Sequence, residues 1–193
     1  MKIIVFENIF AENTLNTDRI AVSFRVDSTI IKGNKPFYMP EFSGDFAAQL
    51  FAAAKVCKLG KNIATRFAHR YYDTFALSIC LKANDLLQRK ETQNLAVSFD
   101  GATSLSNFFP VEKMDFKQAN IDFHFNNNIY TVNNFEHFIS ITNEMIAYAS
   151  KFCILKTGDL LLSELNFEVK NIKIGDKMSV FFNKNKILEQ KIK

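Results

Sequence analysis

The chain has 193 residues, of which 48% are apolar and 23% are charged, and its formal net charge is +4. This composition excludes a disordered chain and predicts one domain, or at most two small ones, in a chain long enough to fold without disulfides or a structural metal. Basic and acidic residues alternate along the chain without forming a basic stripe, so we expect no nucleic-acid partner.

The first half of the chain predicts two short strands and one ambiguous segment. Apolar residues alternate over 1–6 and 20–26, as in half-buried strands. The prolines of Lys35–Pro40 indicate an extended edge or connection instead of a central strand. Over 46–54, five alanines and the absence of Gly and Pro give a helical preference by propensity alone.

A second helix is predicted over 62–72, after the turn at Gly60. Its apolar face has the spacing i, i+4, i+8, formed by Ile63, Phe67 and Tyr71. His69 lies in this segment, and we interpret it as a structural histidine.

The middle of the chain predicts a buried strand, a short helix and a hairpin. The apolar run 75–81 suits a buried strand, and 84–89 a short helix. Residues 121–125 alternate, turn at three asparagines and return as 129–132. By parity His124 lies on the polar face of this hairpin, where metal ligation is not expected.

The last third predicts one more helix and a turn. Thr142 is expected to cap a helix whose apolar face is formed by Met145, Ile146, Ala149 and Phe152. Gly158 and Asp159 precede another apolar run, and 173–176 reads as a turn between strands. Short strands with three short helices between them indicate an α+β chain dominated by sheet.

Cysteine usage and the length of the apolar runs indicate the cellular compartment in which we expect the protein. The cysteines Cys57, Cys80 and Cys153 are far apart in the sequence, so we expect neither a disulfide framework nor a zinc site. We expect reduced thiols in a cytoplasmic protein instead. No apolar run reaches the roughly 20 residues of a membrane-spanning helix, and we expect neither membrane insertion nor export. The basic C-terminal tail is predicted to be a solvated end.

Taken in order, several segments resemble the fumarylacetoacetate hydrolase family, especially its short single-domain bacterial members, over almost the whole chain. The matching stretches are Met1–Ile4, Ala11–Glu12, Asp27–Ser28, Lys35–Ser43, Leu59–Ile63, Phe67–Asp73, Phe99–Gly101, Gly158–Asp159 and Ile174–Asp176. The resemblance implies a mixed β-sandwich roll, usually a homodimer, that binds Mg²⁺ or Mn²⁺ and acts on 2-oxo or β-diketo acids. It also implies that residues 47–56 form a strand, against the helical propensity of that segment.

The resemblance places three family metal ligands on residues that cannot serve as carboxylates. The family holds its metal with a Glu-x-Glu pair on one strand and an Asp on a later strand. Here the two Glu positions fall on Gln49 and Phe51, and the Asp position falls on Cys80. No Asp or Glu occurs between Asp45 and Asp73, so a slipped alignment does not restore the pair. We therefore expect no metal cofactor.

Other family site positions are also replaced. The family lysine falls on Val97, and the His and Glu of its lid fall on Asn13 and Asn16, which cannot act as a general acid or base. The Thr-Gly-Thr-Pro loop falls on a stretch that begins with Ser163 and Glu164. Val97, Ser163 and Glu164 are thus the candidates for a residual pocket, with no catalytic residue assigned.

Three hypotheses follow. The leading one is a catalytically inactive family member that acts as a binding or assembly partner, because every site position points the same way. The second is a hydrolase, decarboxylase or isomerase that acts on a 2-oxo or β-diketo acid through a rearranged site. The third is a small-molecule sensor whose pocket is apolar and lined by Phe51.

Overall fold

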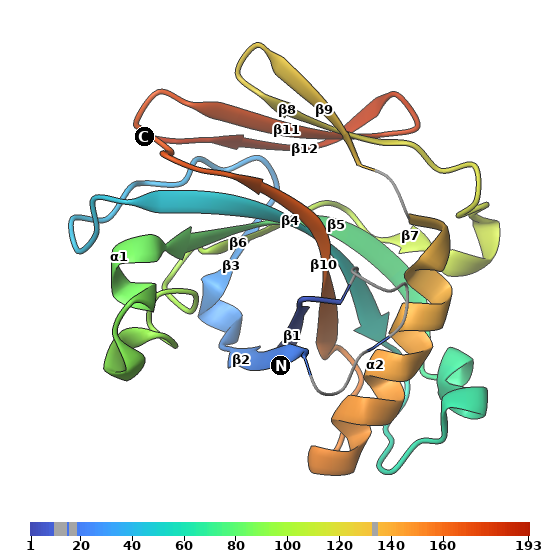
Figure 1. The fold of residues 1–193 in the computed structure, drawn as a ribbon. Helices are drawn as coiled ribbons and strands as arrows, with labels where there is room; N and C mark the ends of the chain where they lie inside the picture. Colours follow the sequence, from blue (N-terminus) through green and yellow to red (C-terminus); the bar gives the residue numbers. More distant parts are fainter. Residues whose placement is uncertain (10–14, 16–18, 133–134) are drawn as a thin grey trace.

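The computed structural model describes residues 1–9, 15, 19–132 and 135–193. Within these residues the strands form two sheets, one large and curled and one small, which lie one above the other in Figure 1. This sheet-dominated α+β architecture confirms the predicted fold class.

The large sheet has the strand order β2-β1-β10-β4-β5-β6-β3, and β7 pairs with β5 beside this path. Its strands are β1 (Ile3–Glu7), β2 (Ala21–Arg25), β3 (Ile30–Lys32), β4 (Phe46–Val56), β5 (Tyr72–Ala83), β6 (Thr103–Leu105), β7 (Phe109–Pro110) and β10 (Leu160–Val169). β1 runs parallel to β10, and β4 is antiparallel to both β10 and β5. The strands predicted over 1–6, 20–26 and 75–81 are confirmed, with shifted ends.

The small sheet has the order β12-β11-β8-β9. It consists of β8 (Ile121–Phe125), β9 (Asn128–Val132), β11 (Lys177–Phe182) and β12 (Asn185–Lys191). The predicted hairpin is the antiparallel pair β8 and β9, and Asn126 in its turn takes a positive φ of 51°. Such a φ suits asparagine better than most residues.

The basic C-terminal tail is not a solvated end, so that prediction was wrong. Residues 185–191 pair with β11, and Glu189 accepts ion pairs from Lys177 and Lys186 at 3.1 and 2.7 Å. Hydrogen bonds from Lys186 and Lys177 lower the pKa of Glu189 to about 2. The lysines of the tail thus neutralise a carboxylate of the sheet.

The alanine-rich segment is strand β4, so the resemblance was right and the helical propensity was wrong. β4 pairs along its length with β10 on one side and β5 on the other, and its alanines are buried. A strand with neighbours on both sides satisfies its backbone groups inside the sheet, and this outweighs the helix preference of a few alanines. Alternate side chains of β4 face opposite sides, with Leu50 in the main core and Phe51 in a second cluster.

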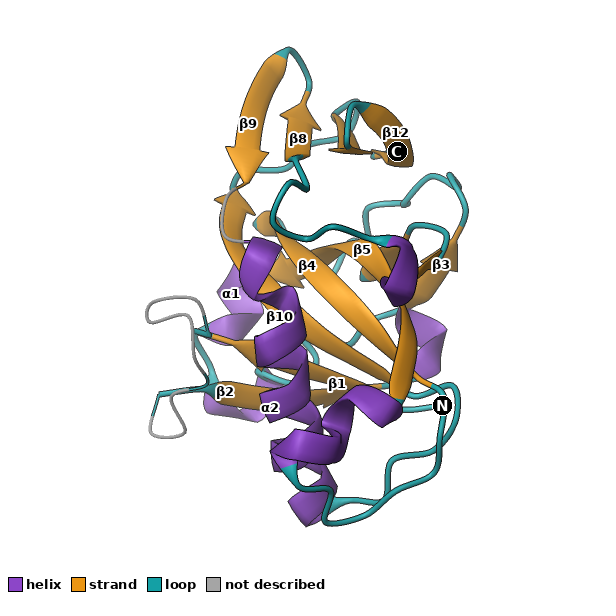
Figure 2. Ribbon diagram, turned by 90° about the vertical axis from the view of Figure 1, so that its right-hand side faces the viewer, coloured by secondary structure: helices purple, strands orange, loops and turns teal. Residues whose placement is uncertain are grey.

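Two α-helices occur in the described residues, α1 (Asn84–Leu87) and α2 (Phe138–Phe152). α2 lies along the large sheet near β10 and β1 (Figure 2). It begins four residues before Thr142, whose hydroxyl is buried within the helix and has no hydrogen-bond partner in the described part of the chain. The predicted cap at Thr142 was therefore wrong, and Phe152 at the helix end is 67% exposed.

The segment predicted as an amphipathic helix over 62–72 contains only a 3₁₀ helix, η2 (Thr65–Arg70). The backbone N–H of Asn62 and that of Ile63 bond to the carbonyl and hydroxyl of Ser150 on α2, and β5 already begins at Tyr72. The remaining 3₁₀ helices are η1 (Asp27–Thr29), η3 (Lys90–Thr92), η4 (Val111–Lys113) and η5 (Phe135–His137). Docking onto α2 and the early start of β5 leave too little chain for the predicted α-helix.

The main core fills the space between the two sheets and α2, and many of its members are phenylalanines. Phe75 of β5 is central, with its ring centre 5.3 to 5.8 Å from those of Phe116, Phe135 and Phe138. Edge-to-face and tilted arrangements of this kind add to the stabilisation from apolar burial.

A second, smaller cluster lies on the opposite face of the large sheet, and we call it the inner cluster. It consists of Ile3, Val5, Phe51, Ala53, Ala76, Cys80, Leu105, Leu160 and Leu162. Because the sheet curls around this face, the inner cluster is enclosed by strands (Figure 1).

Strand β2 has the reverse of its expected orientation. Its apolar residues Val22 and Phe24, and Val26 just beyond it, are 37%, 53% and 55% exposed, whereas Arg25 is only 3% exposed. Arg25 is the register partner of Ile3 and therefore faces the inner cluster. Of the residues on this face of β2, Arg25 is buried, Ser23 is half-buried and Ala21 is exposed.

No helix in the described part of the chain is long and apolar enough to cross a membrane.

Candidate functional site

The three positions at which the family resemblance places metal ligands lie together in the structure. Gln49 and Phe51 are two residues apart on β4, so their side chains share one face. Cys80 of β5 is the register partner of Gln49. This shared face is the one that bears the inner cluster.

Each of the three side chains is already engaged. Phe51 and Cys80 are members of the inner cluster, at 0% and 1% exposed, and the Cys80 sulfur lies 3.5 Å from the Ser78 hydroxyl. Gln49 donates a hydrogen bond from Nε2 to Oε1 of Glu164 at 2.9 Å.

This donor set does not fit a hard divalent ion. Mg²⁺ and Mn²⁺ prefer several oxygen ligands, mostly carboxylates, whereas Gln49, Phe51 and Cys80 offer one neutral amide, one hydrocarbon ring and one thiol. The described residues contain no group of three or more His, Cys, Asp or Glu side chains arranged to hold a metal.

Glu164 of β10 lies at the centre of this face. It is the register partner of Phe51, and its Oε2 accepts a hydrogen bond from the Asn8 backbone N–H at 3.1 Å. Together with the bond from Gln49, this engages both of its carboxylate oxygens. Asn8 holds the required backbone conformation with a φ of 63°.

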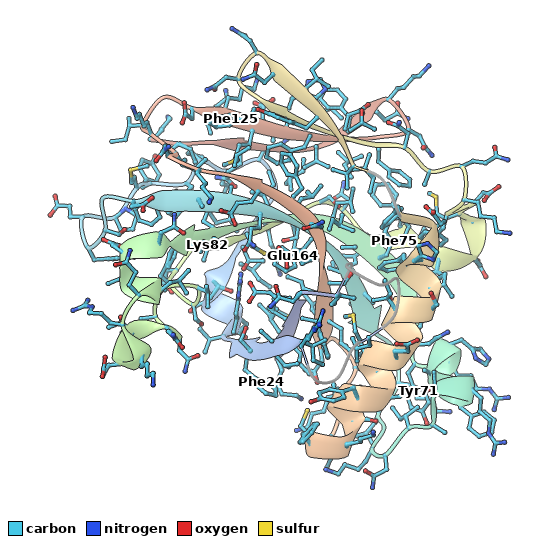
Figure 3. All side chains as sticks on the ribbon, viewed as in Figure 1. Phe24, Tyr71, Phe75, Lys82, Phe125 and Glu164 are labelled. Atoms are coloured by element: carbon cyan, nitrogen blue, oxygen red, sulfur yellow. The ribbon has the colours of Figure 1, made fainter. Side chains whose placement is uncertain are left out.

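A second acid on β10 is paired with a lysine of β5. The register of β10 shifts between Glu164 and Glu168, and Glu168 becomes the partner of Gln49. Lys82 Nζ lies 2.5 Å from Glu168 Oε2, and both side chains are largely buried. Figure 3 labels Lys82 and Glu164 on the same part of the curled sheet. This pair brings a cation close to the family ligand positions.

Glu7, at the end of β1, is the third acid of this region. Burial raises its pKa; the positive charges of Arg25 and Lys82 oppose this effect, and the negative charges of Glu164 and Glu168 add to it. We call Glu7, Gln49, Lys82, Glu164 and Glu168 the inner polar cluster. Its titratable groups were missed in the sequence, except Glu164, because they lie on strands without a local motif.

Arg25 is the other site residue that sequence reasoning missed. Its guanidinium carbon lies 5.9 Å from the centre of the Phe51 ring, and its Nη1 donates a long hydrogen bond of 3.4 Å to Thr103 Oγ1. Thr103 of β6 is the register partner of Cys80. The guanidinium therefore lies beside two of the three family ligand positions.

The candidates for a residual pocket are not brought together. Ser163 faces the opposite side of β10 from Glu164, and its hydroxyl donates to the Ala52 carbonyl at 3.3 Å. Val97 is buried in the loop before β6. Asn13 and Asn16, at the family lid positions, lie outside the described residues.

The histidines singled out in the sequence lie apart from this site. His69 is in η2, and His124 of β8 stacks on Phe181 with ring centres 4.2 Å apart. Cys57, Cys80 and Cys153 are free thiols.

Comparison of the sequence with models of known protein families identifies the family of this chain. A sequence model of the fumarylacetoacetate (FAA) hydrolase C-terminal domain matches residues 14–182. A search of curated proteins found no match to the sequence.

Solved structures share the fold at low sequence identity. A protein from Yersinia pestis CO92, provisionally assigned to the fumarylacetoacetate hydrolase family, is 19% identical with a TM-score of 0.84, covering 100% of this chain and 92% of that one. Fumarylpyruvate hydrolase from Pseudomonas aeruginosa, solved with Mn²⁺ and pyruvate, is 14% identical with a TM-score of 0.79, covering 99% and 88%. The 5-carboxymethyl-2-hydroxymuconate delta-isomerase from Mycobacterium smegmatis is 15% identical with a TM-score of 0.82, covering 99% and 76%.

Proposed function

Because the chain belongs to the fumarylacetoacetate hydrolase family, we propose that it is a catalytically inactive member that keeps the fold as a single domain over residues 1–193 and serves as a binding or assembly partner. One observation carries this proposal. The positions that match the family ligands, Gln49, Phe51 and Cys80, do converge on one face, yet Phe51 and Cys80 belong to the inner cluster and Gln49 is bonded to Glu164.

The loss of acid and base groups supports the same proposal. The family lysine position holds Val97, and the family lid positions hold Asn13 and Asn16. Proton transfer to or from a substrate needs a titratable group within hydrogen-bond reach, and none of these side chains provides one.

A second candidate function is a hydrolase, decarboxylase or isomerase that acts on a 2-oxo or β-diketo acid through a rearranged site. The specific observation in its favour is Glu7, a half-buried carboxyl with a raised pKa on the same face as Lys82. A carboxyl with a raised pKa can serve as a general acid or base. The names of the hydrolase and the isomerase of similar fold agree with this kind of chemistry.

A third candidate is a small-molecule sensor that binds a ligand beside Phe51 without turnover. The buried cation above that ring favours it.

We also propose that the chain forms a homodimer through the β2 edge. β2 ends the strand order of the large sheet as far as it is described, and it exposes Val22 and Phe24 next to Phe152 of α2. A row of exposed apolar residues on an edge strand is a common interface between identical chains. Location in the cytoplasm, a bacterial source and the absence of a nucleic-acid partner remain proposals from the sequence.

Metal content and turnover together test the proposed function. The protein purified in excess Mg²⁺ and Mn²⁺ should contain no stoichiometric metal after gel filtration, and it should neither decarboxylate oxaloacetate nor hydrolyse an acylpyruvate. Turnover of either compound, lost in a Glu7→Gln variant and retained in a Glu91→Gln control on the surface, would instead support the rearranged enzyme.

A further inference from the structure

The inner face of the curled sheet holds a cation that lacks an adequate partner. Arg25 is only 3% exposed, and its Nε has no hydrogen-bond partner among the residues that the structure describes. Its hydrogen bond to Thr103 is 3.4 Å long, at the weak end of the range. Its remaining contact is the face of the Phe51 ring.

Such an environment is costly for a guanidinium. Arginine stays charged in proteins, and a buried charge is destabilising unless it is paired and hydrogen-bonded. Within the described residues no carboxylate forms an ion pair with Arg25. An anion that reached this point would therefore gain both charge and hydrogen-bond complementarity.

The carboxyl groups near Arg25 are bonded to other residues or have a raised pKa. Glu164 accepts from Gln49 and Asn8, and Glu168 is paired with Lys82. Burial raises the pKa of Glu7, which reduces its tendency to carry the compensating charge. Within the described residues the inner polar cluster therefore provides no ion-pair partner for the Arg25 guanidinium.

We propose that Arg25 supplies, from the protein itself, the positive charge that a metal would provide in the family, and that its guanidinium binds the carboxylate of a small monocarboxylic acid without any metal ion. The geometry behind this is the position of the guanidinium over Phe51 and beside Thr103, the partner of Cys80. The inference rests on the proposed function, because it requires that no divalent ion occupy this place.

The chemistry of the surroundings selects the ligand class. Nε and one terminal nitrogen of a guanidinium form a planar fork that matches the two oxygens of a carboxylate. Phe51 and the leucines of the inner cluster suit a short apolar body. Glu164 lies on the same face, and its negative charge would repel a doubly charged anion such as phosphate more strongly than a singly charged carboxylate.

The test measures propionate binding to the metal-free protein. Calorimetry and thermal melts are performed in EDTA, with sodium chloride at matched ionic strength and inorganic phosphate as controls. The variant is Arg25→Lys, which keeps the charge but loses the fork, and the matched control is Arg89→Met, which removes an exposed arginine. Propionate should bind the wild-type chain and Arg89→Met equally, and Arg25→Lys at least about tenfold more weakly.

A second measurement works even if Arg25→Lys folds poorly. In the ¹⁵N-labelled wild-type protein, propionate should shift the resonance of the buried Arg25 Nε–H, and phosphate should not. Absence of propionate binding to the folded protein, equal binding by Arg25→Lys, or binding lost in EDTA would each overturn the inference. The first two failures leave the proposed function intact, whereas binding lost in EDTA would indicate a metal ion and contradict both proposals.

Discussion

Phe51 gives the sharpest prediction, because it occupies a position at which the family resemblance implies a metal-binding carboxylate. Its ring is fully buried in the inner cluster. Truncation of a buried Phe to Ala costs about 3–5 kcal/mol, through lost transfer energy and the cavity left behind. For a chain of this length each kcal/mol corresponds to about 2–4 °C in melting temperature, so Phe51→Ala should melt roughly 6–20 °C lower.

Replacement by the family residue should be no less damaging. Phe51→Glu loses the same apolar contacts and places a carboxylate opposite Glu164, its register partner on β10. Arg25 can offset part of this charge, but the desolvation of a buried carboxylate remains. We therefore expect Phe51→Glu to be at least as unstable as Phe51→Ala at neutral pH.

The assay is chemical denaturation followed by fluorescence or circular dichroism, with and without Mn²⁺. Phe51→Leu, which keeps most of the apolar volume, should lose less than about 1.5 kcal/mol. Tyr38→Ala, which removes an aromatic ring that is 69% exposed, should lose less than about 0.5 kcal/mol. If Phe51→Glu were as stable as Phe51→Leu, or if Mn²⁺ selectively stabilised it, the position would be a ligand site and not core.

Three further predictions concern the family site, the buried carboxylate of Asp159 and the β2 edge. The triple variant Gln49→Glu, Phe51→Glu, Cys80→Asp should be less stable than wild type without metal, be partly rescued by Mn²⁺ in thermal melts, and still not decarboxylate oxaloacetate; turnover would contradict it. Burial opposes ionisation of Asp159, but hydrogen bonds from its lysine neighbours outweigh this and lower its pKa. Its stabilisation is therefore present above the unfolded pKa of about 3.9 and lost as the pH falls through the lower folded value. Asp159→Asn should thus cost about 1–3 kcal/mol at neutral pH and flatten the acid limb of a stability profile, and an unchanged limb would refute this. Phe24→Glu should convert the proposed dimer to a monomer in light scattering, whereas a dimer that survives it would exclude this edge.

The sequence predicts the order of elements well where patterns are local. The hairpin of β8 and β9 follows from clean alternation around an asparagine turn, which needs no tertiary information. β4 required more. Its alanines favour a helix, and only the pairing with β10 and β5, or a resemblance to proteins that have it, indicates a strand.

Helix ends were predicted less well because tertiary contacts set them. Thr142 has the chemistry of a cap, yet α2 starts at Phe138, where packing against Phe75 and Phe116 stabilises an earlier turn. The 62–72 segment has helical spacing, but its bonds to Ser150 and the start of β5 restrict it to a 3₁₀ helix. Neither set of contacts is visible in a local pattern.

Some residues of the candidate site could also be predicted from the sequence, and others could not. Gln49, Phe51, Cys80 and Glu164 were identified through motif order, and the structure places them on one face. Arg25 was missed, because alternation over 20–26 assigns it to a solvated polar face. Only the curl of the sheet turns that face inward and leaves Phe24 outside (Figure 3).

We propose that the family metal position does not bind a divalent ion in this protein. Electron paramagnetic resonance during a titration with Mn²⁺ measures this directly, because free and protein-bound Mn²⁺ give different signals. We predict that the wild-type chain leaves all added Mn²⁺ free. One bound Mn²⁺ per chain, released when Gln49 and Cys80 are replaced by Leu and Ala but not when the exposed Glu91 is replaced by Gln, would contradict the claim.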